Sequence, residues 1–210
     1  FSKMAILNRD AISSEFSNFV TNPNFSTYGS LVSADYSFEI NDLVLPDGYV
    51  GKFNTPEFGQ IPARVRIFGE HSLLPVTSAV AVAVKMGLSA NEIQTGLGKI
   101  QPVPGRMNFL RGVEKSILID DTYNSSPAAA EAALRALYNL NVPSRIAILG
   151  SMNELGATSA EEHQKIGAFC DPLSLSWVIT VGDKANNYLA PAARARGCQV
   201  KTCRNAIEAA

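Results

Sequence analysis

The sequence predicts an α/β protein made of two parts that differ in the order of their elements. Residues 1 to about 70 contain short alternating segments, such as Tyr36–Ile40 and Ala63–Phe68, that are typical of half-buried antiparallel strands. A pair of helical segments follows. From Met107 onward, apolar runs of strand length alternate with helical segments. That alternation favours parallel strands joined by helical crossovers, and therefore a mostly parallel sheet.

Composition and charge exclude several classes of function. The chain has 210 residues, of which 46% are hydrophobic and 18% charged, with a formal net charge of −1. This charge gives no electrostatic reason to expect nucleic acid or an anionic membrane as a partner. The three cysteines are an odd number without CxxC spacing, which suits a reducing cytoplasm better than a disulfide framework. No apolar run approaches the roughly 20 residues that span a bilayer. We therefore expect a cytoplasmic protein without membrane insertion.

The first part is expected to hold several short strands and one early helix. Strands are predicted at Ala5–Leu7 and Phe25–Gly29 as well as at the two alternating segments. The spacing of apolar residues in Asp10–Val20 predicts a helix. The segments Pro46–Gly48 and Asn54–Pro56 carry the chemistry of turns.

A helix pair closes the first part. The first helix is expected from about Pro75 to Met86, and the second is expected to begin at Ser89. Glu92 follows Ser89 by three residues, which predicts a capping box. The segment Gln101–Arg106 then contains two prolines and a glycine, and it is the best candidate for a domain boundary.

The second part is expected to be a sheet whose strands end on one edge. Strands are predicted at 116–120, 145–149, 177–181 and 199–202, and helices at 127–140, 158–170, 184–196 and from 204 onward. Right-handed crossovers place the carboxyl ends of parallel strands together, where ligands of open α/β sheets bind. The segments on that edge would be Asp120–Asn124, Gly150–Glu154 and Gly182–Lys184.

Two adjacent acids are the first candidate site residues. Asp120 and Asp121 end a strand, and on an extended strand neighbouring side chains point to opposite sides. Only one of them is then expected to face a site. That carboxylate could accept hydrogen bonds from a ribose or a substrate ammonium. The alternative is structural: Asp121 or Thr122 could cap the following helix.

Three other candidates also have structural alternatives. Arg106 lies in the linker, where it could bind linker carbonyls or reach an anionic ligand. His71 and His163 are the two histidines, and each could make a structural hydrogen bond. The sequence contains no GxxxxGK[ST], GxGxxG, HExxH or GxSxG motif. We therefore name no catalytic residue and no metal ligand in this chain.

Three blocks, PVPGRMN at 102–108, IDDTYNSSP at 119–127 and AILGSMNELGATSAEEH at 147–163, together resemble the Mur ligase family. They are most similar to its branch that adds D-alanyl-D-alanine. ILNRD at 6–10 and the histidine-headed, alanine-rich helix pair agree more loosely. The resemblance implies that residues 1–104 are the later part of the central ATPase-type domain. Residues 105–210 would be most of the Rossmann-like C-terminal domain.

Both ends of the chain look cut, so we expect a fragment of a longer enzyme. By the resemblance, the UDP-binding domain, the P-loop and the metal ligands would lie outside this sequence. The fragment alone is then expected not to turn over ATP. We expect a monomer whose partners are small-molecule substrates.

The implied reaction is ATP-driven amide formation with Mg²⁺. The carboxylate of a UDP-muramoyl-peptide would be phosphorylated, and the amine of D-alanyl-D-alanine would attack the acyl phosphate. Two sets of residues would serve these ligands. The nucleotide set comprises Arg106, Asp121, Asn124, His71 and Ser72, and the acceptor set comprises Tyr123, Ser151, Asn153, Glu154, Leu155 and His163.

The sequence departs from the family pattern at four positions. Ser72 and Pro75 stand where asparagines near the adenine are usual, Ser126 replaces another asparagine, and Ser151 replaces an aspartate. These departures keep two alternatives open. One is a related Mur-type or folylpolyglutamate-type ligase with another acceptor. The other is a Rossmann-like binding module without ligase activity.

Overall fold

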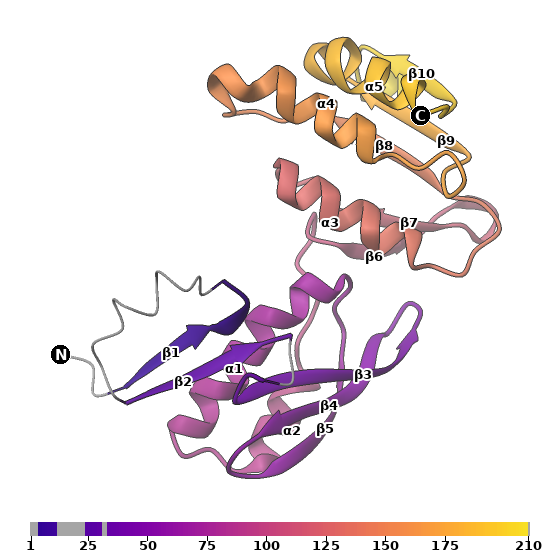
Figure 1. Cartoon of the computed structure of the whole chain (residues 1–210). Helices are drawn as coiled ribbons and strands as arrows, with labels where there is room; N and C mark the ends of the chain where they lie inside the picture. Colours follow the sequence, from indigo (N-terminus) through magenta and orange to yellow (C-terminus); the bar gives the residue numbers. More distant parts are fainter. Residues whose placement is uncertain (1–3, 12–23, 31–32, 210) are drawn as a thin grey trace. The chain divides into compact units, whose positions relative to one another are not determined.

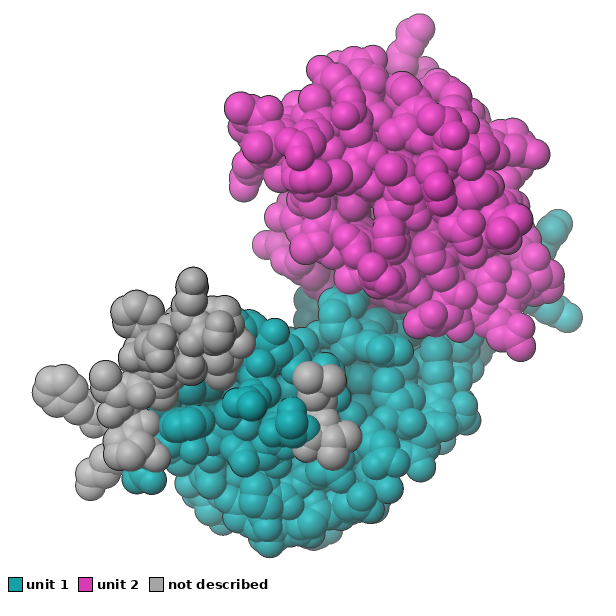
Figure 2. Space-filling view, viewed as in Figure 1, with its two compact units in different colours: residues 1–103, 108–118 teal, residues 104–107, 119–210 magenta. Residues whose placement is uncertain are grey.

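The computed structural model describes residues 4–11, 24–30 and 33–209, shown as a ribbon in Figure 1. The chain divides into two compact units (Figure 2). Unit 1 consists of residues 1–103 and 108–118, and unit 2 of residues 104–107 and 119–210. No helix in the described ranges is long and apolar enough to cross a membrane. The helix predicted at Asp10–Val20, with Ile12, Phe16 and Val20 as core positions, lies largely outside the described residues. The described residues Arg9–Ala11 form a 3-10 turn.

Unit 1 is built on a five-stranded sheet in the order β1-β2-β3-β4-β5. Its strands are β1 Ala5–Asn8, β2 Phe25–Gly29, β3 Tyr36–Val44, β4 Gly48–Thr55 and β5 Gly59–Val65. The first three run parallel, whereas β3, β4 and β5 are antiparallel neighbours. The expected antiparallel strands are confirmed, although β5 ends three residues before the predicted end at Phe68.

Strand β4 was not predicted, because turn-forming residues bracket it and two glycines interrupt its apolar pattern. Its burial nevertheless alternates, with Tyr49 and Phe53 in the core. Gly51 is required by the sheet itself, since a Cβ there would lie 2.1 Å from the carbonyl oxygen of Glu39 on β3. Gly48 has φ 90°, a conformation that glycine adopts without strain, at the turn between β3 and β4.

Two helices cover this sheet and complete its core. Helix α1 spans Leu73–Lys85 and α2 spans Ala90–Leu97. The predicted capping box is confirmed: the Ser89 hydroxyl accepts from the amide of Glu92, whose carboxylate accepts from the amide of Ser89. The helices bury their apolar faces against the sheet. The core comprises Tyr36, Phe53, Ile61, Ala63, Val65, Val76, Val80, Ala81, Val84, Ile93 and Leu97.

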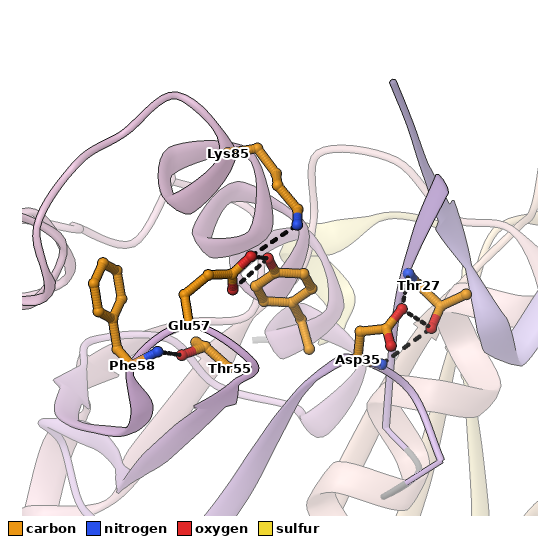
Figure 3. Close-up of polar contacts among 7 residues, drawn as sticks. Thr27, Asp35, Thr55, Glu57, Phe58 and Lys85 are labelled. Carbon is orange, nitrogen blue, oxygen red and sulfur yellow. Dashed lines mark hydrogen bonds and ion pairs between the residues drawn. The ribbon is translucent and has the colours of Figure 1, made fainter. Parts of the chain in front are cut away.

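A polar network joins three elements of unit 1 (Figure 3). The Glu57 carboxylate accepts from the Tyr36 hydroxyl at 2.8 Å and from the Lys85 ammonium at 2.7 Å. These residues come from the start of β3, the β4–β5 turn and the end of α1. Nearby, the Asp35 carboxylate accepts from the amide and hydroxyl of Thr27, which fixes the return of the chain from β2 to β3. Burial and the Glu57 carboxylate raise the pKa of Tyr36 to about 12.

This network predicts acid sensitivity of unit 1. Partial burial acts to raise the pKa of Glu57, but hydrogen bonds from Lys85 and Tyr36 outweigh it, so its pKa lies below the ordinary value. The carboxylate therefore stabilises the fold above its ordinary pKa, and this stabilisation is lost as the pH falls through the lowered value. We expect Glu57→Gln to cost about 1 kcal/mol at pH 7. The substitution should also make the free energy of unfolding depend less on pH between roughly pH 6 and pH 3, the range in which carboxylates titrate. Urea unfolding followed by circular dichroism measures this dependence.

Glu39 provides the matched control in the same sheet. Its carboxylate lies 3.3 Å from the Lys52 ammonium and is half exposed. Glu39→Gln should change the urea midpoint far less than Glu57→Gln, since exposed ion pairs contribute little. Equal effects of the two substitutions would contradict the importance of the network.

Unit 2 contains a three-stranded parallel sheet in the order β10-β9-β8. Strands β8 Ile146–Gly150, β9 Trp177–Val181 and β10 Val200–Cys203 lie within one residue of their predicted positions. The helices are α3 Pro127–Tyr138, α4 Ser159–Phe169, α5 Ala190–Ala195 and α6 Ala206–Ala209. Helix α4 contacts both α3 and α5.

Two expectations about this part need correction. Strand β7, Ile117–Asp120, does not join the parallel sheet but pairs with β6, Asn108–Arg111. Only residues 112–116, which include the 3-10 turn at Val113–Lys115, separate the two strands, so their pairing closes a much smaller loop than pairing across α3 would. The predicted helix 184–196 is also divided, into a π-helical turn at Ala185–Leu189 and α5. Pro191 lacks the amide that would continue the regular pattern.

Candidate functional site

Residues 105–107 of the linker are held by the two adjacent acids. The Asp120 carboxylate accepts from the amide of Gly105 at 3.1 Å, and the Asp121 carboxylate accepts from the amide of Met107 at 3.0 Å. The Gly105 carbonyl in turn accepts from the amide of Tyr123 at 3.1 Å. All of these residues belong to unit 2. We call this set of contacts the linker clamp.

In the linker clamp both acids bind the linker backbone, so they do not point to opposite sides as neighbours on a regular extended strand would. β7 ends at Asp120, so Asp121 is no longer bound to the alternation of an extended strand. Both carboxylates can therefore turn toward the same segment. The structural alternative is also wrong, because neither Asp121 nor Thr122 caps the next helix. Ser126 does so, accepting from the amide of Ala129.

The backbone of the clamped segment is unusual at both ends. Gly105 has φ 72°, and a Cβ there would lie 3.1 Å from the Cβ of Tyr123. Met107 has φ 46°, which is uncommon for a residue other than glycine, and its side chain is buried. The segment is thus bent into a shape that its anchors determine.

The middle residue of the segment, Arg106, points onto an aromatic ring. Its guanidinium carbon lies 4.2 Å from the centroid of the Tyr123 ring. Stacking of this kind leaves the N–H groups at the guanidinium edge free to bind anions. No hydrogen bond or ion pair joins that guanidinium to another residue in the described part of the chain. The hydrogen bond from the Thr122 hydroxyl is the main cause that holds the pKa of the Asp120 carboxyl below its usual range. Slight burial acts to raise this pKa, and hydrogen bonds from the amides of Thr122 and Gly105 help to lower it.

The loop after β8 is the second candidate region. The Ser151 hydroxyl accepts from the amide of Ala185 at 3.1 Å, which ties this loop to the turn after β9. Asn153 and Glu154 are exposed, and Glu154 has φ 62°. Leu155 is half-buried. The loop therefore presents an amide and a carboxylate to solvent at the carboxyl end of a parallel strand.

His163 is fully buried beneath this loop. Its Nε2 accepts from the amide of Met152 at 2.9 Å, and its Nδ1 lies 2.6 Å from the carbonyl oxygen of Ser159. A neutral ring with its proton on Nδ1 satisfies both contacts. With both nitrogens engaged, His163 is a residue that supports the loop from below, and its role toward an acceptor remains a prediction.

The other candidates lie on exposed turns. The Asn124 side chain accepts from the amide of Ser125 at 2.9 Å. His71 and Ser72 form part of the 3-10 turn that precedes α1 in unit 1, and the Ser72 side chain makes no capping bond. No group of three or more His, Cys, Asp or Glu side chains in the described ranges could hold a metal ion.

Comparison with known proteins decides the family. The model of the family described as Mur ligase, glutamate ligase domain, matches residues 105–210, half of the chain. The chain belongs to the Mur ligase family. The resemblance expected from the three sequence blocks is thereby confirmed, as is the mixed α/β fold with a parallel sheet.

Relatives of this Mur ligase chain agree with one another in their names. It is 28% identical over 129 residues to the UDP-N-acetylmuramoyl-tripeptide–D-alanyl-D-alanine ligase of Escherichia coli (strain K12), covering 61% of this chain and 28% of that protein. The ligase of the same name from Treponema pallidum (strain Nichols) is 34% identical over 103 residues, covering 49% and 22%. The crystal structure of MurF from Acinetobacter baumannii matches with a TM-score of 0.77 and 28% identity, covering 95% and 42%. The chain thus spans less than half the length of each.

Sequence reasoning missed some residues of the linker clamp. Gly105 was recognised only as a linker glycine, and Met107 was not singled out. The glycine was a usable signal, because a backbone conformation with positive φ can be suspected wherever glycine follows proline in a linker. The amide of Met107 gave no such signal, since its partner lies 14 residues away.

Proposed function

We propose that the whole protein is an ATP-dependent ligase of peptidoglycan precursor synthesis. It would join the carboxyl group of a UDP-N-acetylmuramoyl tripeptide to the amine of D-alanyl-D-alanine. The observation that carries this proposal is the similarity of this chain to ligases that bear that name in several bacteria. The alternating pattern of strands and helices after residue 105 supports it.

The reaction would proceed in two steps. The substrate carboxylate attacks the γ-phosphorus of ATP, forming an acyl phosphate as ADP leaves. The amine nitrogen then attacks the acyl carbon, the C–O bond to phosphate breaks, and the nitrogen loses a proton. Orienting amine and acyl group while excluding water accounts for much of the acceleration in such reactions.

Residues of this chain would bind and orient the substrates. Arg106 would contact the nucleotide phosphates through its free guanidinium edge. The Asp121 carboxylate oxygen that is not bound to Met107 would accept from the ribose. His71, Ser72 and Asn124 complete the proposed nucleotide set. Mg²⁺ also belongs to this proposal, but the described residues contain no cluster that fits it, so no step is assigned to the metal.

The loop after β8 would shape the acceptor pocket together with Tyr123. Asn153, Glu154 and Leu155 would line it, while His163 would hold the loop in place. Ser151 departs from the aspartate that is usual in the family, and its hydroxyl serves the amide of Ala185. This difference favours testing other acceptors.

The test is a ligation assay of the whole protein with purified UDP-muramoyl-tripeptide and ATP. Candidate acceptors are D-alanyl-D-alanine, meso-diaminopimelate, lysine and glutamate, with the product identified by mass spectrometry. We expect ligation with D-alanyl-D-alanine, and Arg106→Ala should raise the KM for ATP by roughly 30-fold. Arg111→Ala, at an exposed position on β6, is the control and should leave the KM unchanged.

Two results would redirect the proposal. Ligation with another amino acid in place of D-alanyl-D-alanine would assign a related Mur-type or folylpolyglutamate-type activity. Absence of ATP binding by calorimetry, in a folded protein, would identify a binding module without ligase activity.

A further inference from the structure

Arg106 lies between two backbone amides that are both bound by acidic side chains. The amides on both sides of it, those of Gly105 and Met107, donate to Asp120 and Asp121. Within the described ranges no hydrogen bond or ion pair joins its own side chain to either acid, and its guanidinium stacks on Tyr123. The acids therefore bind the backbone on both sides of Arg106 and form no ion pair with its guanidinium in the described part of the chain.

We propose that Asp120, Asp121 and Tyr123 are positioning residues that hold the linker and aim the guanidinium of Arg106 at the phosphate groups of a nucleotide. This inference rests on the proposed function in its choice of ligand. The clamp itself rests on the geometry alone. Tyr123 thereby gains a role through Arg106, beside the predicted contact with the acceptor.

The geometry explains why each position carries its residue type. Gly105 has to remain glycine, because its Cβ would approach the backbone amide of Tyr123 at 3.1 Å and its φ is 72°. The Asp120 carboxylate uses one oxygen for Gly105 and the other for the hydroxyl of Thr122 at 2.6 Å. Because both of its oxygens already accept hydrogen bonds, the Asp120 carboxylate competes poorly with an anionic ligand for binding to the Arg106 guanidinium.

An arginine that is held in advance binds an anion better than a free one. The side chain of arginine loses rotamer freedom on binding, and a stacked guanidinium has already lost part of it. An exposed cation–π contact has a modest effect, so removing the Tyr123 ring should weaken nucleotide binding by roughly threefold. Removing the guanidinium should weaken it by roughly 30-fold.

The first experiment measures the Kd for ATP of the whole protein by calorimetry. Tyr123→Leu should weaken binding by roughly threefold, and Tyr123→Phe, which keeps the ring, by less than about twofold. In an Arg106→Ala background, Tyr123→Leu should have no further effect, because a positioning residue acts through the residue it positions. The proposal would be overturned if the fold-losses of ATP affinity from the two substitutions multiplied in the double variant. It would also be overturned if Tyr123→Phe and Tyr123→Leu weakened ATP binding equally.

The second experiment tests the clamp without ATP, by NMR of the protein. Asp120→Ala should accelerate amide exchange of Gly105, and Asp121→Ala that of Met107, each by roughly tenfold. Asp183→Ala is the matched control, since Asp183 is an exposed acid after β9 without a hydrogen bond or ion pair in the described ranges. The Arg106 side-chain signals should lose their ring-current shift in Tyr123→Leu.

The two readouts separate the inference from the proposed function. Unchanged exchange of both amides would refute the clamp even if ATP binds. A second outcome is that amide exchange of Gly105 and Met107 responds as expected, but wild type and Arg106→Ala bind ATP equally well. That outcome would refute the nucleotide as the ligand, and therefore the proposal that the clamp directs Arg106 toward nucleotide phosphates.

Discussion

Replacing Gly167 by alanine is expected to destabilise unit 2 by about 3 kcal/mol, at the upper end of the usual cost of overpacking. Gly167 lies in α4, where the backbone of the next helical segment comes close. A Cβ at this position would lie 2.3 Å from the carbonyl oxygen of Leu189 and 2.7 Å from the Cβ of Ala192. Neither contact involves the flexible end of a side chain, so the segments would have to move apart.

The unfolding of unit 2 can be followed by fluorescence of Trp177, the single tryptophan of the chain. Gly96→Ala is the matched control in α2, because a Cβ there meets nothing within 4 Å. Alanine favours helix over glycine, so Gly96→Ala should stabilise unit 1 by about 0.5–1 kcal/mol, measured by circular dichroism. A Gly167→Ala protein as stable as the wild type would contradict the close approach of the two segments.

His163→Leu is expected to have the second largest effect, a loss of about 2–3 kcal/mol with loosening of the loop after β8. Leucine has a similar size but cannot accept from the amide of Met152, which would remain buried without a partner. The carbonyl of Ser159 would lose its side-chain contact as well. Amide exchange of Met152 should accelerate more than exchange in α3.

Two further variants identify the cause of that loss. His163→Gln can place an acceptor near the position of Nε2, so it should recover part of the stability that leucine loses. His71→Gln changes the other histidine, which is exposed, and should leave stability unchanged. If His163→Gln were no better than His163→Leu, the hydrogen bond to Met152 would not explain the effect.

Most elements of this Mur ligase chain could be predicted because their signals are local. The strand at Trp177–Val181 is an apolar run bounded by polar residues, and the structure places it where predicted. The capping box at Ser89 and Glu92 needs only four residues, and it too is confirmed. Strand β4 escaped prediction because its glycines make room for neighbouring strands, which a single segment does not reveal.

Candidate residues could be named from the sequence, but their partners could not. Asp120, Asp121 and Arg106 stood out as chemistry-bearing types near a linker. Both acids bind the amides beside Arg106, and in each of these hydrogen bonds the partners are 14 or 15 positions apart in the sequence. A local pattern does not reveal partners at that separation. For His163 a structural hydrogen bond is the default expectation from the sequence, and a role toward the acceptor is implied only by the family resemblance. The structure shows that His163 is buried and makes two hydrogen bonds beneath the loop, which no local pattern reveals.

The sequence by itself determined the α/β class, the order of most elements and the family resemblance, because these follow from local periodicity and short motifs. The tertiary structure alone decided that β7 pairs with β6 and that both acids turn toward the linker. It also decided that Arg106 stacks on Tyr123. Each of these depends on which distant groups satisfy one another's hydrogen bonds and fill one another's space, and the pattern along the chain does not encode that choice.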